Sequence, residues 1–277
     1  MEYKFGLIGY PITHSLSPWI HKRFLKATNL KGNYKIYEIP TAFDFAEEMQ
    51  KLKEKGLHGF NVTVPYKEKI IPFLDDLDQQ AEKIGAVNTV LQKDGKWIGY
   101  NTDGIGYVRA LLYKFPELGD TKDTAILILG AGGAAKGILH ALLNEGFTNI
   151  TIANRSLDRA ETLAQAQKGI QVTSLQDAEN TLDDYALIIQ TTSVGMKPRE
   201  EDILISLDKL TRGTIVSDIV YQPIETRFLQ EAERLGAKKH HGHSMLLYQA
   251  QYAFEIWTGQ RPEAESLEAQ LKQTLEG

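Results

Sequence analysis

A cluster of glycines at positions 130–133 constrains the fold of this chain more than any other feature. The apolar run 125–129 stops at Gly130, and small residues follow. This order predicts a strand, a tight turn and a helix. Gly130 can take backbone angles that other residues avoid, and Gly132 and Gly133 let a ligand approach the backbone. The free N–H groups at the helix start suit a pyrophosphate, although a turn without a ligand has the same pattern.

The end of the next predicted strand favours NADP over NAD. Strand 149–153 is followed by Asn154-Arg155-Ser156, where an NAD site usually has an acidic residue for the ribose hydroxyl. A guanidinium and a hydroxyl complement a 2′-phosphate, and Arg159 lies one turn into the next helix. The alternative is that Asn154 and Ser156 cap that helix, with Arg155 a solvated charge. With the glycine turn upstream, the pattern predicts NADP binding.

Composition is typical of an enzyme that acts on small molecules. The 277 residues suffice for two domains, and a hydrophobic content of 42% suffices for packed cores. A net charge of −5 argues against nucleic acid or an anionic membrane as the main partner. The absence of cysteine excludes disulfides and thiol catalysis, and neither a targeting peptide nor a bilayer-spanning apolar run is seen. These features predict a cytoplasmic enzyme.

Two serines near the start of the chain are candidate ligand groups. The apolar run 3–9 predicts a strand, and a loop with Ser15 and Ser17 leads to a helix that begins near Pro18. Either serine could cap that helix, whereas two hydroxyls beside free N–H groups suit a small carboxylate. The neighbouring His14 is a possible acid or base, but a structural role is favoured.

A predicted βαβ unit delivers two further polar side chains. It consists of strand 34–39, helix 43–55 and a strand within 57–67. Thr63 and Lys67 lie at the carboxyl end of this last strand. Ligands of open α/β sheets bind at that edge.

Asn88 and Asp103 are the next candidates along the chain. A helix is expected at 70–74 and a hairpin with an Asp-Gly turn at 90–100. Asp103 can cap the following helix, and its carboxylate can also pair with the ammonium of Lys67. Reduction of a ketone needs a hydride from one side and a proton from the other. A lysine held by a carboxylate can supply that proton.

Six motifs together resemble the shikimate dehydrogenase family. They are Ser-x-Ser-Pro at 15–18, Asn-Val-Thr-Val-Pro-Tyr-Lys at 61–67, Gly-Ala-Val-Asn-Thr at 85–89, Asn-Thr-Asp-Gly at 101–104, Gly-Ala-Gly-Gly-Ala at 130–134 and Asn-Arg-Ser at 154–156. Their order and spacing cover nearly the whole chain. The resemblance implies reversible NADPH-dependent reduction of 3-dehydroshikimate to shikimate, in aromatic amino acid biosynthesis.

The residues and the resemblance together assign roles. Lys67 and Asp103 are the expected catalytic pair. The expected substrate ligands are Ser15, Ser17, Thr63, Asn88, Tyr221 and Gln249. The expected cofactor ligands are Gly130, Ala131, Gly132, Gly133, Ala134, Asn154, Arg155, Ser156, Arg159, Thr192, Ile219, Gly242 and Met245. The resemblance implies that the missing side chain of Gly242 gives room to the nicotinamide ring.

Three features of the second half leave alternatives open. Strand 187–190 ends in Gln190 where the family has Asn, and the longer amide could alter the backbone hydrogen bonds of the next loop. The phenol of Tyr221 could reach a substrate carboxylate or only pack. The histidines within 240–243 suggest a metal, but alternate faces of a strand divide them and no carboxylate is near. No metal site is predicted.

The predicted fold class is α/β, with two α/β domains and a cleft between them. Residues 1–103 plus 240–277 form a substrate-binding domain with an open, mostly parallel sheet, to which apolar C-terminal helices return. Residues 104–239 form a Rossmann-like NADP-binding domain. We expect a small-molecule substrate, no nucleic-acid or membrane partner, and a monomer or homodimer.

Two other functions are alternatives. An NAD-dependent quinate/shikimate dehydrogenase shares most of the motifs, and the surroundings of Arg155 argue against it. A non-catalytic dinucleotide-binding regulator shares the fold, and the presence of both Lys67 and Asp103 argues against it.

Overall fold

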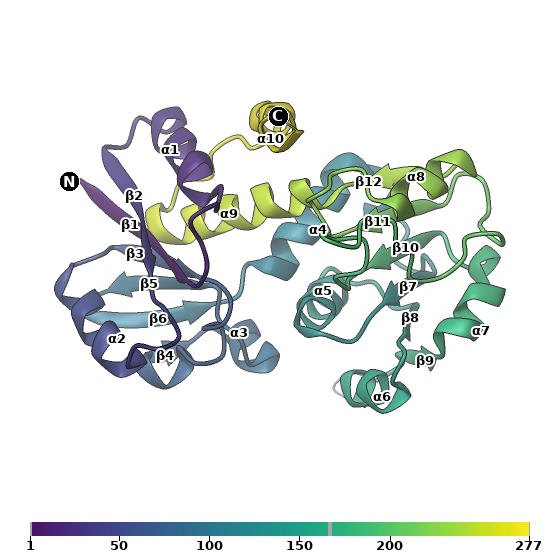
Figure 1. Ribbon diagram of the computed structural model, residues 1–277, viewed down its shortest axis with the longest axis horizontal. Helices are drawn as coiled ribbons and strands as arrows, with labels where there is room; N and C mark the ends of the chain where they lie inside the picture. The colour runs from purple at the N-terminus through teal and green to yellow at the C-terminus, as the bar shows by residue number, and fades with distance from the viewer. Residues whose placement is uncertain (1, 166–167, 277) are drawn as a thin grey trace. The chain divides into compact units, whose positions relative to one another are not determined.

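The computed structural model describes residues 2–165 and 168–276, which form two compact α/β units (Figure 1). The first unit contains the chain up to Gly106 together with Gln249–Ala264. The second contains Tyr107–Tyr248 together with the chain from Glu265 onward. The predicted α/β class is confirmed. Among the described residues, no helix is long and apolar enough to cross a membrane.

The first unit is built on a sheet with the strand order β2-β1-β3-β5-β6-β4. The strands are β1 (Tyr3–Gly9), β2 (Gly32–Glu38), β3 (Gly59–Val62), β4 (Asp76–Leu77), β5 (Thr89–Lys93) and β6 (Lys96–Tyr100). Only β5 runs against the others, since it pairs antiparallel with both β3 and β6. The sheet is therefore mostly parallel, as predicted. Asp94 and Gly95 form the hairpin turn, both with positive φ.

Local sequence sets the helices of the first unit, which are α1 (Ser17–Ala27), α2 (Phe45–Glu54) and α3 (Gln79–Ile84). The side chain of Asp44 caps α2, and α2 packs Met49 and Leu52 on the sheet residues Ile8 and Phe60. The helix expected at 70–74 is wrong. Only a 3₁₀ turn, η1 (Ile71–Phe73), forms there, because Pro72 cannot donate the helical hydrogen bond.

The second unit is built on a fully parallel sheet with the order β12-β11-β10-β7-β8-β9. The strands are β7 (Ile126–Leu129), β8 (Ile150–Ala153), β9 (Gln171–Thr173), β10 (Leu187–Gln190), β11 (Ile215–Asp218) and β12 (Lys238–His240). Read from β9, this is the 3-2-1-4-5-6 order of dinucleotide-binding folds. The predicted Rossmann-like arrangement is confirmed.

The four central strands β7, β8, β10 and β11 are buried on both faces, which explains why each begins as a mostly apolar run. Along β7, Ile126 and Ile128 join one apolar cluster with Ile138, while Leu127 joins another with Phe228. The helices of this unit are α4 (Asp103–Lys114, which begins in the first unit), α5 (Gly133–Asn144), α6 (Leu157–Gln165), α7 (Leu175–Asn180) and α8 (Arg227–Arg234), with 3₁₀ turns η2 (Pro116–Gly119) and η3 (Leu182–Asp184).

The C-terminal helices divide between the units differently from the expected domains. Helix α9 (Gly242–Thr258) contributes Gln249 and later residues to the first unit, where Trp257 donates to the carbonyl of Val90 at 2.9 Å. Helix α10 (Glu265–Glu276) belongs to the second unit. Glu268 of α10 accepts a hydrogen bond from Ser244, in the first turn of α9. The apolar residues of these helices do not by themselves predict which unit each helix contacts.

Candidate active site

Lys67 and Asp103, 36 positions apart in the chain, form an ion pair in the first unit. The Nζ atom of Lys67 lies 2.7 Å from Oδ2 of Asp103. Lys67 follows β3, and Asp103 is the first residue of α4. Both side chains are partly exposed, 33% for the lysine and 22% for the aspartate. The pair is therefore fixed in position yet accessible to a ligand.

Asn88 holds the other oxygen of this carboxylate. Its Nδ2 donates to Oδ1 of Asp103 at 2.8 Å. Its own Oδ1 accepts from the backbone N–H of Thr102 at 2.8 Å and from the hydroxyl of Thr89 at 2.9 Å. These donors fix the orientation of a buried amide. Asn88, expected to bind substrate, thus also positions Asp103.

Asn61 and Tyr34 extend this network and were not singled out from the sequence. The Nδ2 of Asn61 donates to Oγ1 of Thr89 at 3.0 Å and to the carbonyl of Asn88 at 3.1 Å. Its Oδ1 accepts from the Tyr34 hydroxyl at 2.8 Å. Burial raises the pKa of Tyr34, so the phenol remains a donor. An amide within the buried strand β3 was the available signal, because buried polar groups require partners.

Ser15 lies two residues before α1, Ser17 is the first residue of α1, and neither is its N-cap. The N-cap residue is Leu16, and no side chain caps the helix. Ser15 Oγ accepts from the N–H of Ser17 at 3.2 Å and lies 3.2 Å from the Ser17 hydroxyl. The paired hydroxyls predicted from the sequence are thus together. His14 is exposed.

Thr63 and Gln249 complete the predicted substrate residues of the first unit. The N–H of Thr63 donates to the carbonyl of Ile8 at 2.9 Å, which places it at the carboxyl ends of β1 and β3. Gln249 of α9 packs by its backbone against Gly106, one turn after Asp103. The remaining predicted substrate residue, Tyr221, lies after β11 in the second unit and is 37% exposed.

The glycine turn of the second unit has the geometry that a diphosphate requires. Gly130 has φ +112°, and a Cβ there would lie 2.7 Å from Oγ1 of Thr191, so only glycine fits. Gly132 is the N-cap of α5, and a Cβ on Gly132 or Gly133 would meet open space. No side chain caps α5. The N–H groups of its first turn, beside Ala131 and Ala134, therefore fit an anionic group.

The residues after β8 present polar and cationic groups that fit a phosphate. Asn154 donates through Nδ2 to the carbonyl of Ser156 at 2.9 Å. Ser156, Arg155 and Arg159 are exposed. Neither arginine forms an ion pair within residues 2–165 and 168–276. Two guanidinium groups without acidic partners match the 2′-phosphate of NADP.

The structure gives Gly242 a role besides the expected one. A Cβ on Gly242 would lie 2.4 Å from the carbonyl oxygen of Ile219 and 2.6 Å from that of Val220. The missing side chain therefore lets α9 begin against the backbone that follows β11. Met245, one turn later, packs on the apolar cluster of the second unit. Thr192 lies in the loop after β10, where its N–H donates to the side chain of Gln190.

Comparisons with known proteins now decide the family. Three family models match consecutive segments: the shikimate dehydrogenase substrate binding domain at residues 7–90, shikimate / quinate 5-dehydrogenase at 114–219, and the shikimate 5′-dehydrogenase C-terminal domain at 242–272. A curated relative from Oceanobacillus iheyensis, named shikimate dehydrogenase (NADP(+)), is 53% identical over 278 residues, covering 100% of both chains. The chain belongs to the shikimate dehydrogenase family. The resemblance carried by the six motifs is confirmed.

Solved structures agree with this family assignment. Shikimate 5-dehydrogenase from Thermus thermophilus, in complex with NADP(H) and shikimate, is 32% identical with a TM-score of 0.87, covering 99% of this chain and 100% of that one. Quinate dehydrogenase from Corynebacterium glutamicum, in complex with NAD, is 27% identical with a TM-score of 0.88, covering 100% and 99%. One family fold thus accommodates either dinucleotide, so local residues decide between them.

In this member of the shikimate dehydrogenase family, the three histidines at positions 240, 241 and 243 lie in different surroundings. Burial lowers the pKa of His240 to about 3 and that of His243 to about 4. The side chains that face His240, His241 and His243 are Ser217, Glu225 and Glu268, respectively. In the part of the chain that the structure describes, no three His, Cys, Asp or Glu residues are grouped to hold a metal ion.

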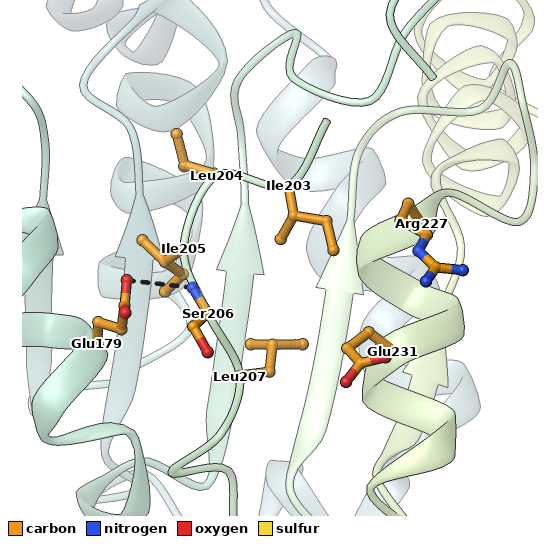
Figure 2. Close-up of a pocket in the computed structure, with 8 residues that line it drawn as sticks. All are labelled: Glu179, Ile203, Leu204, Ile205, Ser206, Leu207, Arg227 and Glu231. Atoms are coloured by element: carbon orange, nitrogen blue, oxygen red, sulfur yellow. Dashed lines mark hydrogen bonds between the residues drawn. The ribbon is translucent and has the colours of Figure 1, made fainter. Parts of the chain in front are cut away.

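A separate hollow of about 480 Å³ lies on the second unit, and none of the residues that line it is a predicted site residue (Figure 2). It is lined by Glu179, Ile203, Leu204, Ile205, Ser206, Leu207, Arg227 and Glu231. On one side of the hollow, Glu179 accepts a hydrogen bond from the N–H of Ser206 at 3.1 Å (Figure 2). None of the family motifs contributes to this hollow. The ion pair and the glycine turn, rather than this hollow, define the candidate site.

Proposed function

We propose that this protein is an NADP-dependent shikimate dehydrogenase, an oxidoreductase that reversibly reduces 3-dehydroshikimate to shikimate. The observation that carries the proposal is the 2.7 Å ion pair between Lys67 and Asp103, in a chain that belongs to this family. The relatives named shikimate dehydrogenase (NADP(+)) and the solved complex with NADP(H) and shikimate support it.

Lys67 is the proposed proton donor in the reductive direction. NADPH, when bound, supplies the hydride that reduces the C3 ketone. Negative charge then develops on the ketone oxygen, and an unprotonated alkoxide in a site shielded from water would be costly. The Lys67 ammonium first stabilises this charge and then gives up a proton to the oxygen. In the oxidative direction the neutral amine takes that proton back.

Asp103 is proposed to orient the reacting groups. One oxygen holds the Lys67 ammonium, while the other is fixed by Asn88. A carboxylate held on both sides can accept from a substrate hydroxyl without reorganising, which places the oxygen that reacts beside the lysine. Asp103 thus determines both the position of the proton donor and that of the substrate.

Neutral side chains are proposed to bind the rest of the substrate. Hydroxyl and amide donors can hold a carboxylate without an arginine where water is excluded. The paired hydroxyls of Ser15 and Ser17, at the start of α1, are suited to this role. The proposed substrate ligands are Ser15, Ser17, Thr63, Asn88, Tyr221 and Gln249.

The second unit is proposed to bind NADP, and the first to bind the substrate. The substrate-binding family model at residues 7–90 supports the latter assignment. The N–H groups at the start of α5 would hold the diphosphate, and the arginines after β8 the 2′-phosphate. The proposed cofactor ligands are Gly130, Ala131, Gly132, Gly133, Ala134, Asn154, Arg155, Ser156, Arg159, Thr192, Ile219, Gly242 and Met245.

One assay separates the proposed function from its alternatives. Purified protein is mixed with shikimate or quinate and with NADP, NAD or no cofactor, and the absorbance of the reduced nicotinamide is followed. We expect turnover with shikimate and NADP, and much slower turnover in Lys67→Met. A preference for NAD or for quinate would instead support a quinate/shikimate dehydrogenase. Dinucleotide binding without turnover would support a regulator.

Two further predictions concern the protein in the cell. We propose a cytoplasmic location, which cell fractionation tests. We also propose a monomer or homodimer that binds only small molecules in its active site, and light scattering after size exclusion tests the number of subunits.

A further inference from the structure

Gln190 and Asp218 form a buried junction at the carboxyl ends of two neighbouring strands. Residue 190 ends β10, residue 218 ends β11, and the two are register partners in the parallel ladder. Their side chains join directly, because Nε2 of Gln190 donates to Oδ1 of Asp218 at 3.1 Å. Both side chains are almost fully buried. The junction therefore lies at the sheet edge where the cofactor is proposed to bind.

The amide of Gln190 closes the loop that follows β10. Its Nε2 also donates to the carbonyl of Val194 at 3.1 Å. Its Oε1 accepts from the backbone N–H of Thr192. One side chain thus supplies three hydrogen bonds, two of them to this loop and the third to Asp218. The residue that departs from the family pattern has all its polar atoms engaged.

The carboxylate of Asp218 closes the segment that follows β11. Its Oδ1 also accepts from the N–H of Val220 at 2.9 Å, and its Oδ2 accepts from the hydroxyl of Thr226 at 2.7 Å. Thr226 is in turn the N-cap of α8. The segment from Asp218 to Thr226 contains Ile219 and Tyr221, both proposed ligands. A single carboxylate therefore holds both ends of this segment.

Asp218 is a buried carboxylate that is held by neutral donors. Among the described residues no cation pairs with it, and its donors are an amide, a backbone N–H and a hydroxyl. Burial raises the pKa of Asp218 to about 6. A buried carboxylate without a cation still has a desolvation cost, which its three hydrogen bonds offset in part.

We propose that Asp218, acting through Gln190, Val220 and Thr226, is a positioning residue that holds the two loops against the nicotinamide end of NADP. This inference rests on the proposed function. It assigns Asp218 no contact with the cofactor or the reacting atoms. Its effect is exerted through the backbone around Thr192 and Ile219.

The experiment compares Asp218→Ala and Asp218→Asn with a matched control, Ser217→Ala. Ser217 precedes Asp218 on β11, is equally buried, and bonds to Tyr107 and His240 on the other face of the strand. The dissociation constant of NADPH is measured by its fluorescence, together with Tm and the KM values for NADP and shikimate. An Asn side chain retains the acceptor oxygen for Gln190 and Val220.

We expect Asp218→Ala to weaken NADPH binding by roughly tenfold, corresponding to about 1.4 kcal/mol, and to lower kcat, with the KM for shikimate changed less than twofold. Asp218→Asn should restore most of the NADPH affinity. Ser217→Ala should lower Tm while leaving NADPH affinity unchanged. If Asp218→Ala lowers Tm like the control and binds NADPH normally, Asp218 is only structural and the inference is overturned.

A second variant keeps the test decisive if Asp218→Ala does not fold. Gln190→Leu removes the hydrogen bond to Asp218 from the side of β10. It should weaken NADPH binding as Asp218→Ala does. Normal NADPH affinity in this variant would also overturn the inference. Turnover of the unmodified protein with shikimate and NADP is measured in parallel. Its absence would contradict the proposed function, whereas the binding comparison alone decides on Asp218.

Discussion

A Cβ atom on Gly106 would lie 2.4 Å from the backbone nitrogen of Gln249, so α4 and α9 touch through their backbones in the first unit. Gly106→Ala gains about 1 kcal/mol of helix propensity but forces the backbones apart, and overpacking costs about 1–3 kcal/mol. The clash should prevail, because backbone atoms cannot rotate away. We expect a lower Tm and a raised KM for shikimate, measured by thermal melting and steady-state kinetics.

Gly119→Ala is the control for that variant, because a Cβ on Gly119 would meet open space. Gly119→Ala should change neither the Tm nor the KM for shikimate. A Gly106→Ala protein with an unchanged Tm would show that the helices separate freely at this contact.

Lys67→Met retains the length of the side chain and removes its charge and its proton. We expect kcat to fall by roughly two to four decades while NADP affinity stays near normal, since the lysine lies in the first unit and the proposed NADP site lies in the second. Asp103→Asn should lower kcat and also raise the KM for shikimate. Near-normal kcat in Lys67→Met would transfer the acid role to another group, and His14 would be examined first.

Arg155→Ala should weaken the binding of NADP selectively. Loss of one charge-assisted contact to the 2′-phosphate costs on the order of 1.5–3 kcal/mol, which is about tenfold or more in affinity. Affinity for NAD, which lacks that phosphate, should remain unchanged. Titration with both dinucleotides measures this difference.

Arg227→Ala provides the matched control, because Arg227 is another exposed arginine of the same unit and lines only the hollow of Figure 2. Equal kcat/KM for NADP and NAD in the unmodified protein would contradict the proposed role of Arg155.

Ser15→Ala and Ser17→Ala test whether the hydroxyls bind substrate. Each neutral contact is worth about 1 kcal/mol, so each variant should raise the KM for shikimate roughly fivefold and leave the KM for NADP unchanged. Thermal melting serves as the second measurement. A lower Tm with normal shikimate binding would show that the hydroxyls stabilise the loop instead.

His21 should make the protein sensitive to acid. Its ring is fully buried and stacks on Tyr34 at 4.5 Å, and burial lowers its pKa to about 3. Because the folded pKa is depressed, the stability that depends on the neutral ring is fully present above pH 6.5. It is lost as pH falls toward 3, by about 1.4 kcal/mol per pH unit.

His21→Phe keeps an aromatic ring and removes this titration. Between pH 7.5 and pH 5, its free energy of unfolding should fall by about 2 kcal/mol less than that of the unmodified protein, as measured by urea denaturation. The same decrease in both proteins would show that other groups, such as His240 and His243, dominate acid unfolding.

Several predictions from the sequence depend only on local physical chemistry. The apolar run before Gly130 predicts β7, and the hairpin with positive φ at Asp94 and Gly95 follows from the residues of the turn. The helix expected at 70–74 failed at this same local level, because Pro72 outweighed the apolar residues around it.

Other relationships depend on which elements the tertiary structure brings together. The division of the C-terminal helices required the contacts of Trp257 with Val90 and of Ser244 with Glu268. Asn61, Tyr34 and Asp218 carry buried hydrogen bonds that no motif predicted, because their partners are distant in the chain.

The sequence by itself determined the chemistry and the family, because residue types such as a lysine, an aspartate and a run of glycines limit what each loop can do. Only the tertiary structure decided which of them meet. Lys67 and Asp103 are 36 positions apart, and they come within 2.7 Å because β5 and β6 return the chain beside β3. The pairing of strands depends on hydrogen bonds and burial across the whole sheet. Neither Lys67 nor Asp103 carries a local sequence pattern that predicts this pairing.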